Sequence, residues 1–128
     1  MVIVYSGGQF EEETSSEVWV QGSNLAYNID IYISGIVLAN YNCRLAIERP
    51  DGETSNELIA TLTDNEFYRY TVPSWVTDVA GTVKITTRIK KTSDNTIYAQ
   101  GLVSKSVSEG VLPNEEATIT ETQYQALL

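Results

Sequence analysis

The chemistry open to this chain is limited first by the residues that it lacks. Its 128 residues include no histidine and a single cysteine, Cys43. Catalytic arrangements of serine, histidine and acid, or of cysteine and histidine, are therefore excluded within the chain. Zinc sites built from cysteine and histidine are excluded for the same reason. The sequence also has no glycine-rich phosphate loop and no calcium-binding loop, so we predict no cofactor and no metal.

Carboxylates are the remaining catalytic candidates. The chain has 17 acidic residues, and a pair of carboxylates can act as general acid and base. Asp64 and Glu66 form such a pair in the segment "TDNEF". Acidic and amide residues are equally typical of a tight turn, which this segment also resembles. An enzyme would need a cleft completed by another chain, so we expect a non-enzymatic protein.

The charge balance argues against nucleic acid as a partner. Acidic residues outnumber basic ones by 17 to 8, which gives a net charge of −9, whereas phosphate binding requires cations. Half of the basic residues nevertheless gather in one segment: Lys84, Arg88, Lys90 and Lys91. On a strand, three of these cations would share one face with two threonines. We interpret this face as a solvated outer surface opposed by acidic neighbours, rather than as an anion site.

Two smaller features have structural interpretations. The acidic group of Glu11, Glu12, Glu13 and Glu17 lies among serines and threonines. It is typical of a solvated loop or of an edge that resists stray strand pairing. Cys43 alternates with apolar residues in "CRLAI" and has only one basic neighbour to lower its pKa. We therefore expect a buried, unreactive thiol.

Alternation of apolar and polar residues predicts about eight short strands. The clearest example is "LAYNIDIYI", whose apolar face is formed by Leu25, Tyr27, Ile29, Ile31 and Ile33. Turn signals recur about every 8–12 residues, which favours an all-β fold, an antiparallel β-sandwich. In "EVWVQ", Val18 and Val20 share a face, and Gly101 within "TIYAQGLVSKSV" predicts a β-bulge.

The segment "YTVPSWVTDVAG" interrupts this alternation at residues 70–81. Pro73 lacks an N–H group and therefore ends strand pairing. Ser74 is a typical N-cap, and Gly81 stands where a left-handed C-cap is expected. Between them, apolar residues recur at helical spacing over about 75–80. We predict a strand, a short capped helical turn that closes one end of the core, and a second strand.

Surface aromatic residues are the candidates for binding. The chain has two tryptophans and eight tyrosines, and alternation places Trp19, Tyr32 and Tyr98 away from the core. Exposed rings of this kind occur in protein interfaces. They also occur in carbohydrate-binding β-sandwich modules, so composition leaves both functions open.

Three segments together resemble the N-terminal domain of bacteriophage baseplate upper proteins, from phages of Gram-positive bacteria. They are "YTVPSWVTDVAG" followed by an alternating strand, "LAIERPDGETSN" before "ELIATL", and the ending "EEATITETQYQALL". Their order covers residues 18–128, whereas the first 17 residues match no such pattern. The resemblance implies a non-enzymatic β-sandwich that anchors a receptor-binding or adhesion device to the tail tip.

The resemblance also implies partners and a location. The partners would be other baseplate or tail proteins and copies of the chain itself as a homo-oligomer. The protein would be made in the bacterial cytoplasm and carried in the virion. No membrane partner is expected, because no apolar run reaches the length of about 18 residues that spans a bilayer. The resemblance supplies no site residue, only structural roles for Pro73, Ser74 and Gly81.

The expected organisation has three parts. Residues 1–17 form an N-terminal arm or edge strand, and residues 18–110 form the β-sandwich domain. Residues 111–128 form a linker and the start of a helix, because Thr120 and Gln123 make a capping box before an apolar stripe. A helix of that length is unstable alone, so we expect it to continue into a downstream region.

Overall fold

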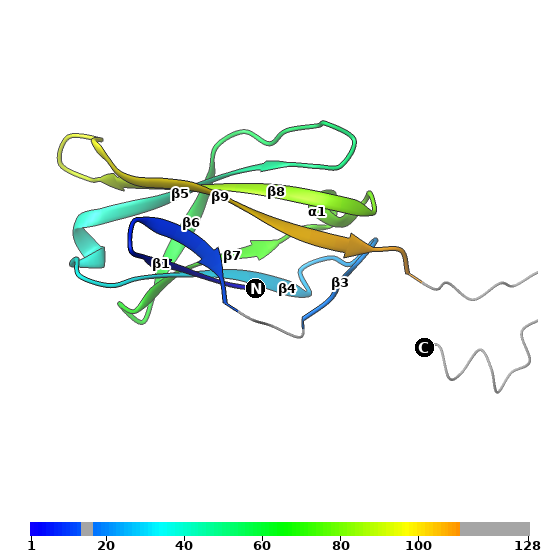
Figure 1. Cartoon of the computed structure of the whole chain (residues 1–128), viewed down its shortest axis with the longest axis horizontal. Coiled ribbons are helices and arrows are strands. Elements are labelled where there is room, and N and C mark those ends of the chain that lie inside the picture. The colour runs from blue at the N-terminus through cyan, green and yellow to red at the C-terminus, as the bar shows by residue number, and fades with distance from the viewer. Residues whose placement is uncertain (14–16, 111–128) are drawn as a thin grey trace, which may run out of the picture.

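The computed structural model describes residues 1–13 and 17–110 of the chain, and these residues form a β protein with very little helix (Figure 1). The strands are β1 (Val2–Ser6), β2 (Gln9–Glu12), β3 (Trp19–Val20), β4 (Tyr27–Ile33), β5 (Tyr41–Glu48), β6 (Leu58–Thr63), β7 (Phe67–Val72), β8 (Gly81–Lys91) and β9 (Ile97–Ser108). A short 3-10 helix, η1 (Leu38–Asn40), precedes β5, and the helical turn α1 (Ser74–Thr77) links β7 to β8. The prediction of a mainly β fold is confirmed.

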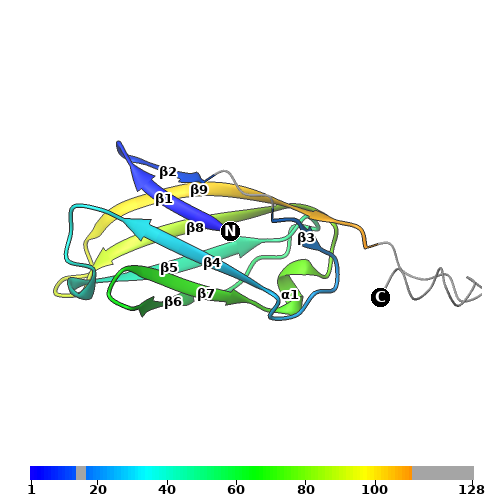
Figure 2. The ribbon, with the colours of Figure 1, turned by 90° about the horizontal axis from the view of Figure 1, so that it is seen from below.

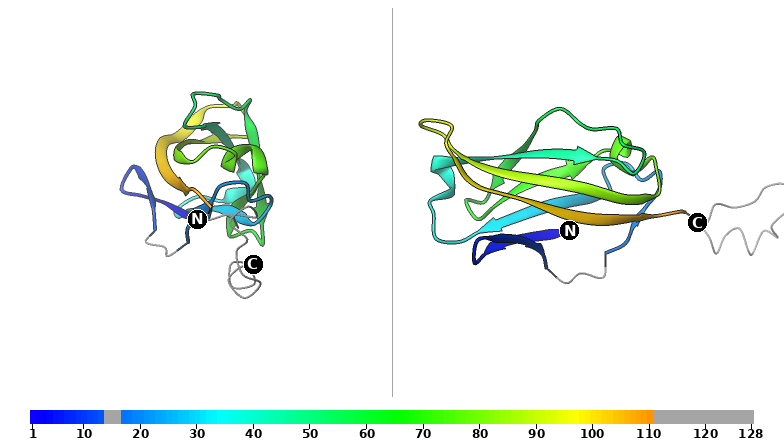
Figure 3. Two further views of the ribbon diagram at one scale, coloured as in Figure 1. Left: turned by 90° about the vertical axis from the view of Figure 1, so that its right-hand side faces the viewer. Right: turned by 45° about the horizontal axis from the view of Figure 1, so that its top comes forward.

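The strands belong to one curled sheet rather than to two separate sheets. Their order is β2-β1-β4-β7-β6-β5-β8-β9-β3. Strand β6 makes the connection, because Leu58–Ala60 pair with β5 whereas Thr61–Thr63 pair with β7. The sheet therefore bends at β6, and β1, β4 and β7 come to lie opposite β5, β8 and β9 (Figure 1). The end-on view in Figure 3 shows this curl. The fold is therefore a half-barrel formed by one sheet, and the expected two-sheet sandwich is not observed.

Two of the eight strand pairings in the described residues are parallel. Strand β1 pairs with β4, and β3 pairs with β9, in parallel; the other six pairings are antiparallel. The expected antiparallel arrangement therefore holds for most of the sheet but not for these two pairs. The parallel pairs arise because the hairpin β1–β2 and the short strand β3 join strands distant in the sequence. Within residues 1–17, expected as an arm or edge strand, β1 and β2 form this hairpin, with β1 inside the sheet and β2 at its edge.

The core lies inside the curl and is filled by alternate residues of the longer strands. Strand β4 contributes Ile29, Ile31 and Ile33, and β5 contributes Cys43, Leu45 and Ile47. The period-two pattern of β4 is therefore confirmed over its length. The pattern was expected to begin at Leu25, but this residue lies outside the strand. It has a positive φ of 56° and is 61% exposed.

The open side of the curl is closed by side chains. Strand β2 lies beside β9 without a described backbone pairing (Figure 2). Phe10 of β2 packs directly over Gly101 of β9, where a Cβ atom would lie 2.7 Å from Phe10 Cδ2. Gly101 therefore serves close packing between two strands that are not hydrogen-bonded to each other.

Gly101 is not the site of a bulge, contrary to the prediction. It pairs regularly with Thr87. The register shifts further along, where Lys90 pairs with Ile97 but Ile89 pairs with Ala99, so Tyr98 is the extra residue. A bulge turns its unpaired side chain, here an aromatic ring, to a new direction.

The helical corner forms, but its caps differ from those expected. Helix α1 starts at Ser74, with Pro73 as the extended N-cap residue (φ −78°, ψ 165°) and no side-chain cap bond. The side chain of Ser74 is therefore not the N-cap. Instead, the Ser74 amide donates a hydrogen bond of 2.9 Å to Oδ1 of Asn24, a residue before β4. Pro73 has no N–H group and therefore ends the strand pairing of β7 before the helix begins.

Gly81 is also displaced from its expected role. Helix α1 ends at Thr77, Asp78 is the C-cap residue in right-handed conformation, and Gly81 is the first residue of β8. Its φ of +132° and the 2.8 Å between its would-be Cβ and Pro50 Cβ both require glycine. The C-terminal helix that was expected from residue 120 lies outside the described residues.

Candidate functional site

Trp19 is fully buried, so its prediction as an exposed interface residue is wrong. Strand β3 pairs with β9 at Trp19 and Val107, which turns the indole ring into the core. The ring stacks on Tyr27 at a centroid distance of 5.6 Å, and its Nε1 donates to Glu17 Oε1 at 2.9 Å. Val18 is the exposed residue instead. Trp19 is a structural residue that no ligand can reach.

An ionic cluster surrounds this tryptophan. The N-terminal ammonium of Met1 lies 2.6 Å from Glu17 Oε1 and donates to the carbonyl of Asn28. Nearby, the buried Lys105 places its Nζ 2.7 Å from Glu12 Oε2 and 3.1 Å from the Glu17 carbonyl oxygen. Glu12 and Glu17 thus join β1, β2 and β3 to β9. Of the two interpretations of the acidic segment, the edge fits Glu12, which lies on the edge strand β2, whereas neither Glu12 nor Glu17 is simply solvated.

The environment of Glu17 favours its ionised form. Burial acts to raise the pKa of this carboxyl group. Hydrogen bonds from the N-terminal ammonium and from Trp19, together with the positive charges of the ammonium and of Lys105, outweigh that effect. The pKa of Glu17 is therefore lowered from its ordinary value.

Tyr98 is exposed and lies in an aromatic cluster where the β1–β2 hairpin meets β9. Its ring centroid is 5.3 Å from Tyr41 and 6.1 Å from Tyr5, and Tyr5 contacts Phe10 at 4.7 Å. Tyr98 is 44% exposed, and it is the bulged residue of β9. The cluster therefore presents a partly open aromatic surface.

Tyr32 belongs to a second cluster, on the outer face of β4 and β7. It is 37% exposed and stacks on Phe67 at 4.9 Å. Arg69 lies over the Phe67 ring, with its Cζ atom 5.1 Å from the ring centroid. The same guanidinium binds Asp30 with two bonds of 2.8 and 2.9 Å. The structure thus places Tyr32 and Tyr98 in separate clusters and does not bring them together in one site.

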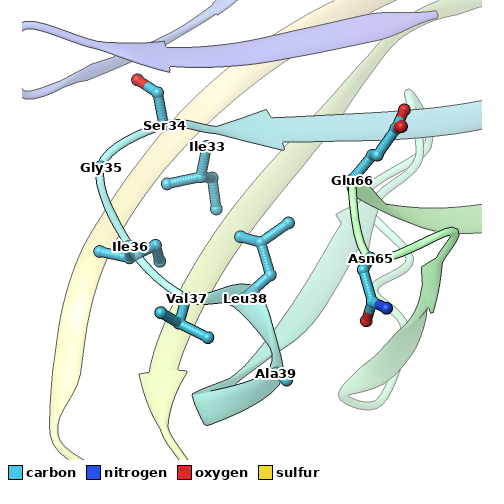
Figure 4. Close-up of a pocket in the computed structure, with 9 residues that line it drawn as sticks. All are labelled: Ile33, Ser34, Gly35, Ile36, Val37, Leu38, Ala39, Asn65 and Glu66. Carbon is cyan, nitrogen blue, oxygen red and sulfur yellow. The ribbon is translucent and has the colours of Figure 1, made fainter.

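A hollow of about 490 Å³ lies at the end of the curl where β4 turns into β5 (Figure 4). The loop from Ser34 to η1 contributes Ile36, Val37 and Leu38, and the β6–β7 turn contributes Asn65 and Glu66. Asp64 and Asn65 have positive φ values of 54° and 56°. The candidate carboxylates Asp64 and Glu66 are therefore turn residues, and of the two only Glu66 lines this hollow.

The basic segment occupies the outer face of β8, as predicted. Lys84, Arg88 and Lys90 alternate with buried residues, and Arg44 of β5 lies directly opposite Arg88. The acidic neighbours are Glu48, paired in register with Lys84, and Glu57, 3.4 Å from Lys90. The sequence did not indicate that Arg44 joins this face, because strand partners cannot be read from alternation alone.

Other chemical candidates are absent from the part of the chain that the structure describes. Cys43 is buried, and burial, only partly offset by Arg44, raises its pKa to about 12. No three acidic, histidine or cysteine side chains in residues 1–13 and 17–110 converge to hold a metal. Within the same residues, no helix is long and apolar enough to cross a membrane.

Comparison with known proteins yields a structural likeness only. No protein family model matches the chain, and no curated protein matches it. Among solved structures, the fold is similar to the N-terminal domain of phage TP901-1 ORF48, with a TM-score of 0.53 and 9% sequence identity. The alignment covers 84% of this chain and 96% of that chain. At this identity the likeness concerns the fold, which is shared with a domain of a phage protein.

Proposed function

We propose that this chain is a non-enzymatic structural domain of a phage tail baseplate, which anchors a receptor-binding or adhesion device through protein–protein contacts. The observation that carries the proposal is the likeness to the N-terminal domain of phage TP901-1 ORF48, which extends over 96% of that domain. A match over nearly a whole domain concerns the complete strand arrangement and not a single hairpin. Fold alone does not determine function, so the proposal also needs support from the surface.

The surface supports contacts with proteins. Tyrosines and arginines are typical of protein interfaces, and the structure has exposed tyrosines at Tyr32 and Tyr98 and partly exposed arginines at Arg44 and Arg88. The residue pattern from Tyr70 to Gly81, which resembles baseplate upper proteins, forms a strand, a helical corner and a strand. The proposed partners are other baseplate or tail proteins and further copies of the chain, and the proposed location is the virion.

The location can be tested in purified phage particles. We expect quantitative mass spectrometry to detect the chain in density-purified particles, in a constant ratio to the major tail protein. Immunogold labelling should then mark the tail tip. A chain found only in the soluble lysate, and never in particles, would contradict the proposal.

Carbohydrate binding is the second candidate, favoured by the partly open ring cluster of Tyr5, Tyr41 and Tyr98. Sugars stack on such rings, although Trp19 is not available for this purpose. Calorimetric titration with cell-wall polysaccharide would test it, with Tyr98→Ala expected to abolish binding and Leu102→Ala as the control. Binding by the Tyr98→Ala variant, or none by the wild type, would exclude this site.

A further inference from the structure

Two arginines face each other across neighbouring strands on the outside of the curl. Arg44 of β5 and Arg88 of β8 are direct partners in the antiparallel register. Like charges in such positions destabilise a sheet. The chain has only 8 basic residues against 17 acidic ones, so placing two of them together is not explained by the stability of the sheet.

The two guanidinium groups are oriented by their neighbours but are not fully engaged. Arg44 Nε donates to Asn42 Oδ1 at 3.2 Å, and Arg88 Nε donates to Gln100 Oε1 at 3.0 Å. Within residues 1–13 and 17–110, no hydrogen bond uses the Nη atoms of either arginine. Each fork is therefore held at its base, while the Nη donors that bind carboxylates in pairs make no hydrogen bond to the described residues.

Glu57 is the carboxylate nearest to these donors, and it is held loosely. Its oxygens lie 3.8 Å from Arg44 Nε, 3.9 Å from Arg88 Nη1 and 3.4 Å from Lys90 Nζ. A charge-assisted hydrogen bond is about 2.7–2.9 Å long, as between Arg69 and Asp30 on the other half of the sheet. Glu57 is 42% exposed and precedes β6 at the end of a long loop. Glu57 is therefore a distant counter-ion to both guanidinium groups.

The surroundings provide space and apolar contacts. A hollow of about 220 Å³ lies between Arg44, Ser55, Glu57 and Arg88, where the small side chain of Ala46 leaves room. Ile59, the register partner of Arg44, is 60% exposed, and Leu102 on β9 is 57% exposed. A surface with cations between exposed aliphatic side chains can contact both the charged and the apolar side chains of a polypeptide. A uniformly polar polyanion would leave the aliphatic side chains without a partner.

We propose that this surface, the arginine face (Arg44, Glu57, Ile59, Arg88, Lys90 and Leu102), is not merely solvated, as the sequence suggested, but binds an extended acidic segment of a partner protein. A carboxylate of the segment takes the place of Glu57 between the two guanidinium groups. Neighbouring apolar side chains of the segment contact Ile59 and Leu102. The inference deepens the proposed function by naming the chemistry of the partner. It rests on that function only in placing the partner in the phage tail.

The test uses a fluorescent synthetic peptide in which glutamate and leucine alternate, titrated with the protein at about 50 mM salt to limit screening. We expect saturable binding that Arg44→Gln and Arg88→Gln each weaken about tenfold or more, equivalent to about 1.4 kcal/mol. Arg69→Gln is the matched control, because Arg69 is already paired with Asp30 on the other half of the sheet, and it should leave the affinity unchanged. Glu57→Gln should strengthen binding severalfold by removing the internal competitor. Circular dichroism establishes that each variant is folded.

Several results would overturn the inference. These are no binding by the wild type, equal losses in Arg69→Gln and Arg88→Gln, or an unchanged affinity in Glu57→Gln. Polyphosphate binding as tightly as the peptide would identify a polyanion site instead. Sedimentation showing self-association that Arg44→Gln abolishes would identify a second copy as the occupant. The assay uses isolated protein and peptide. A failure to bind the peptide would therefore contradict this inference alone, whereas absence of the chain from phage particles would contradict the proposed function.

Discussion

At the level of single residues, Gly81 combines two constraints that can be separated by experiment. Gly52 shares the positive φ, at +89°, but a Cβ atom there would meet no neighbour, whereas at Gly81 it would lie 2.8 Å from Pro50. We expect Gly81→Ala to lower the free energy of unfolding by about 2–3 kcal/mol and Gly52→Ala by about 1 kcal/mol. Urea denaturation measures both. Equal losses in the two variants would show that the contact with Pro50 has no energetic effect.

Glu17 is expected to make stability depend on pH. Its pKa is lowered in the folded state, so its contribution is present above the ordinary glutamate pKa of about 4 and is lost as the pH falls through the lowered value. Glu17→Gln keeps an acceptor for Trp19 but removes the charge, and should cost about 1–2 kcal/mol at pH 7. The difference from the wild type should shrink in acid.

The measurement is urea denaturation from pH 7 to pH 3, on protein with a free Met1 amine because an N-terminal tag would remove the ammonium charge. Glu11→Gln, an exposed residue of the same acidic segment, is the control and should remain within about 0.5 kcal/mol of the wild type at every pH. A Glu17→Gln deficit that stays constant from pH 7 to pH 3 would contradict the assignment.

The residues that sequence reasoning placed wrongly share a physical cause. Trp19 lies in a strand of two residues, which is too short for alternation to indicate the buried side. Ser74 was assigned a cap from local spacing, whereas the bond to its amide comes from Asn24, 50 positions earlier. By contrast, the buried face of Ile29, Ile31 and Ile33 follows correctly from a strand of seven residues. Alternation is informative where the strand is long and its partners are regular.

At the level of elements, the contact between β2 and β9 depends on the absence of a side chain at Gly101. Gly101→Val would displace Phe10, because the added Cβ would lie 2.7 Å from its ring. We expect a loss of about 1–3 kcal/mol by overpacking. Hydrogen exchange should show protection lost first in the amides of β1 and β2, with β5 and β8 unaffected.

Leu102→Val is the matched control on the next residue, which is 57% exposed, and it should be nearly neutral. A Gly101→Val protein with unchanged exchange in β1 and β2 would mean that the hairpin is not held by this packing. The sequence indicated a special role for Gly101 but not its partner, since Phe10 lies 91 positions away.

At the level of the whole molecule, the single curled sheet predicts cooperative unfolding. The nine strands of the described residues border one core, and the N-terminal hairpin is tied to β9 by packing and by the ion pair of Lys105 and Glu12. In a Trp75→Phe variant, Trp19 is the remaining tryptophan, and it reports on that junction. Its fluorescence and the far-UV circular dichroism should give coincident urea transitions. A fluorescence change at lower urea would show that β1–β3 unfold separately.

The sequence predicted strands but not how they are joined. Strand number and the helical corner follow from alternation and from the proline, and they are close to what the structure shows. The parallel pairings of β1 with β4 and of β3 with β9, and the double pairing of β6, depend on contacts between distant segments. No local pattern encodes such contacts, so a half-barrel and a two-sheet sandwich have the same strand pattern in the sequence.

The pairing of Trp19 with Val107 also bears on the order of events during synthesis on the ribosome. One of the first strands to emerge from the exit tunnel, β3, pairs with β9, which is the last strand of the described sheet to be translated. Until β9 is translated, the Trp19 ring cannot gain its native contacts with Val107 and Lys105. Contacts of such long sequence separation fold slowly, because a large loop must close before they form. We therefore expect Trp19, the largest of the fully buried side chains in the described residues, to lack these contacts until β9 has emerged.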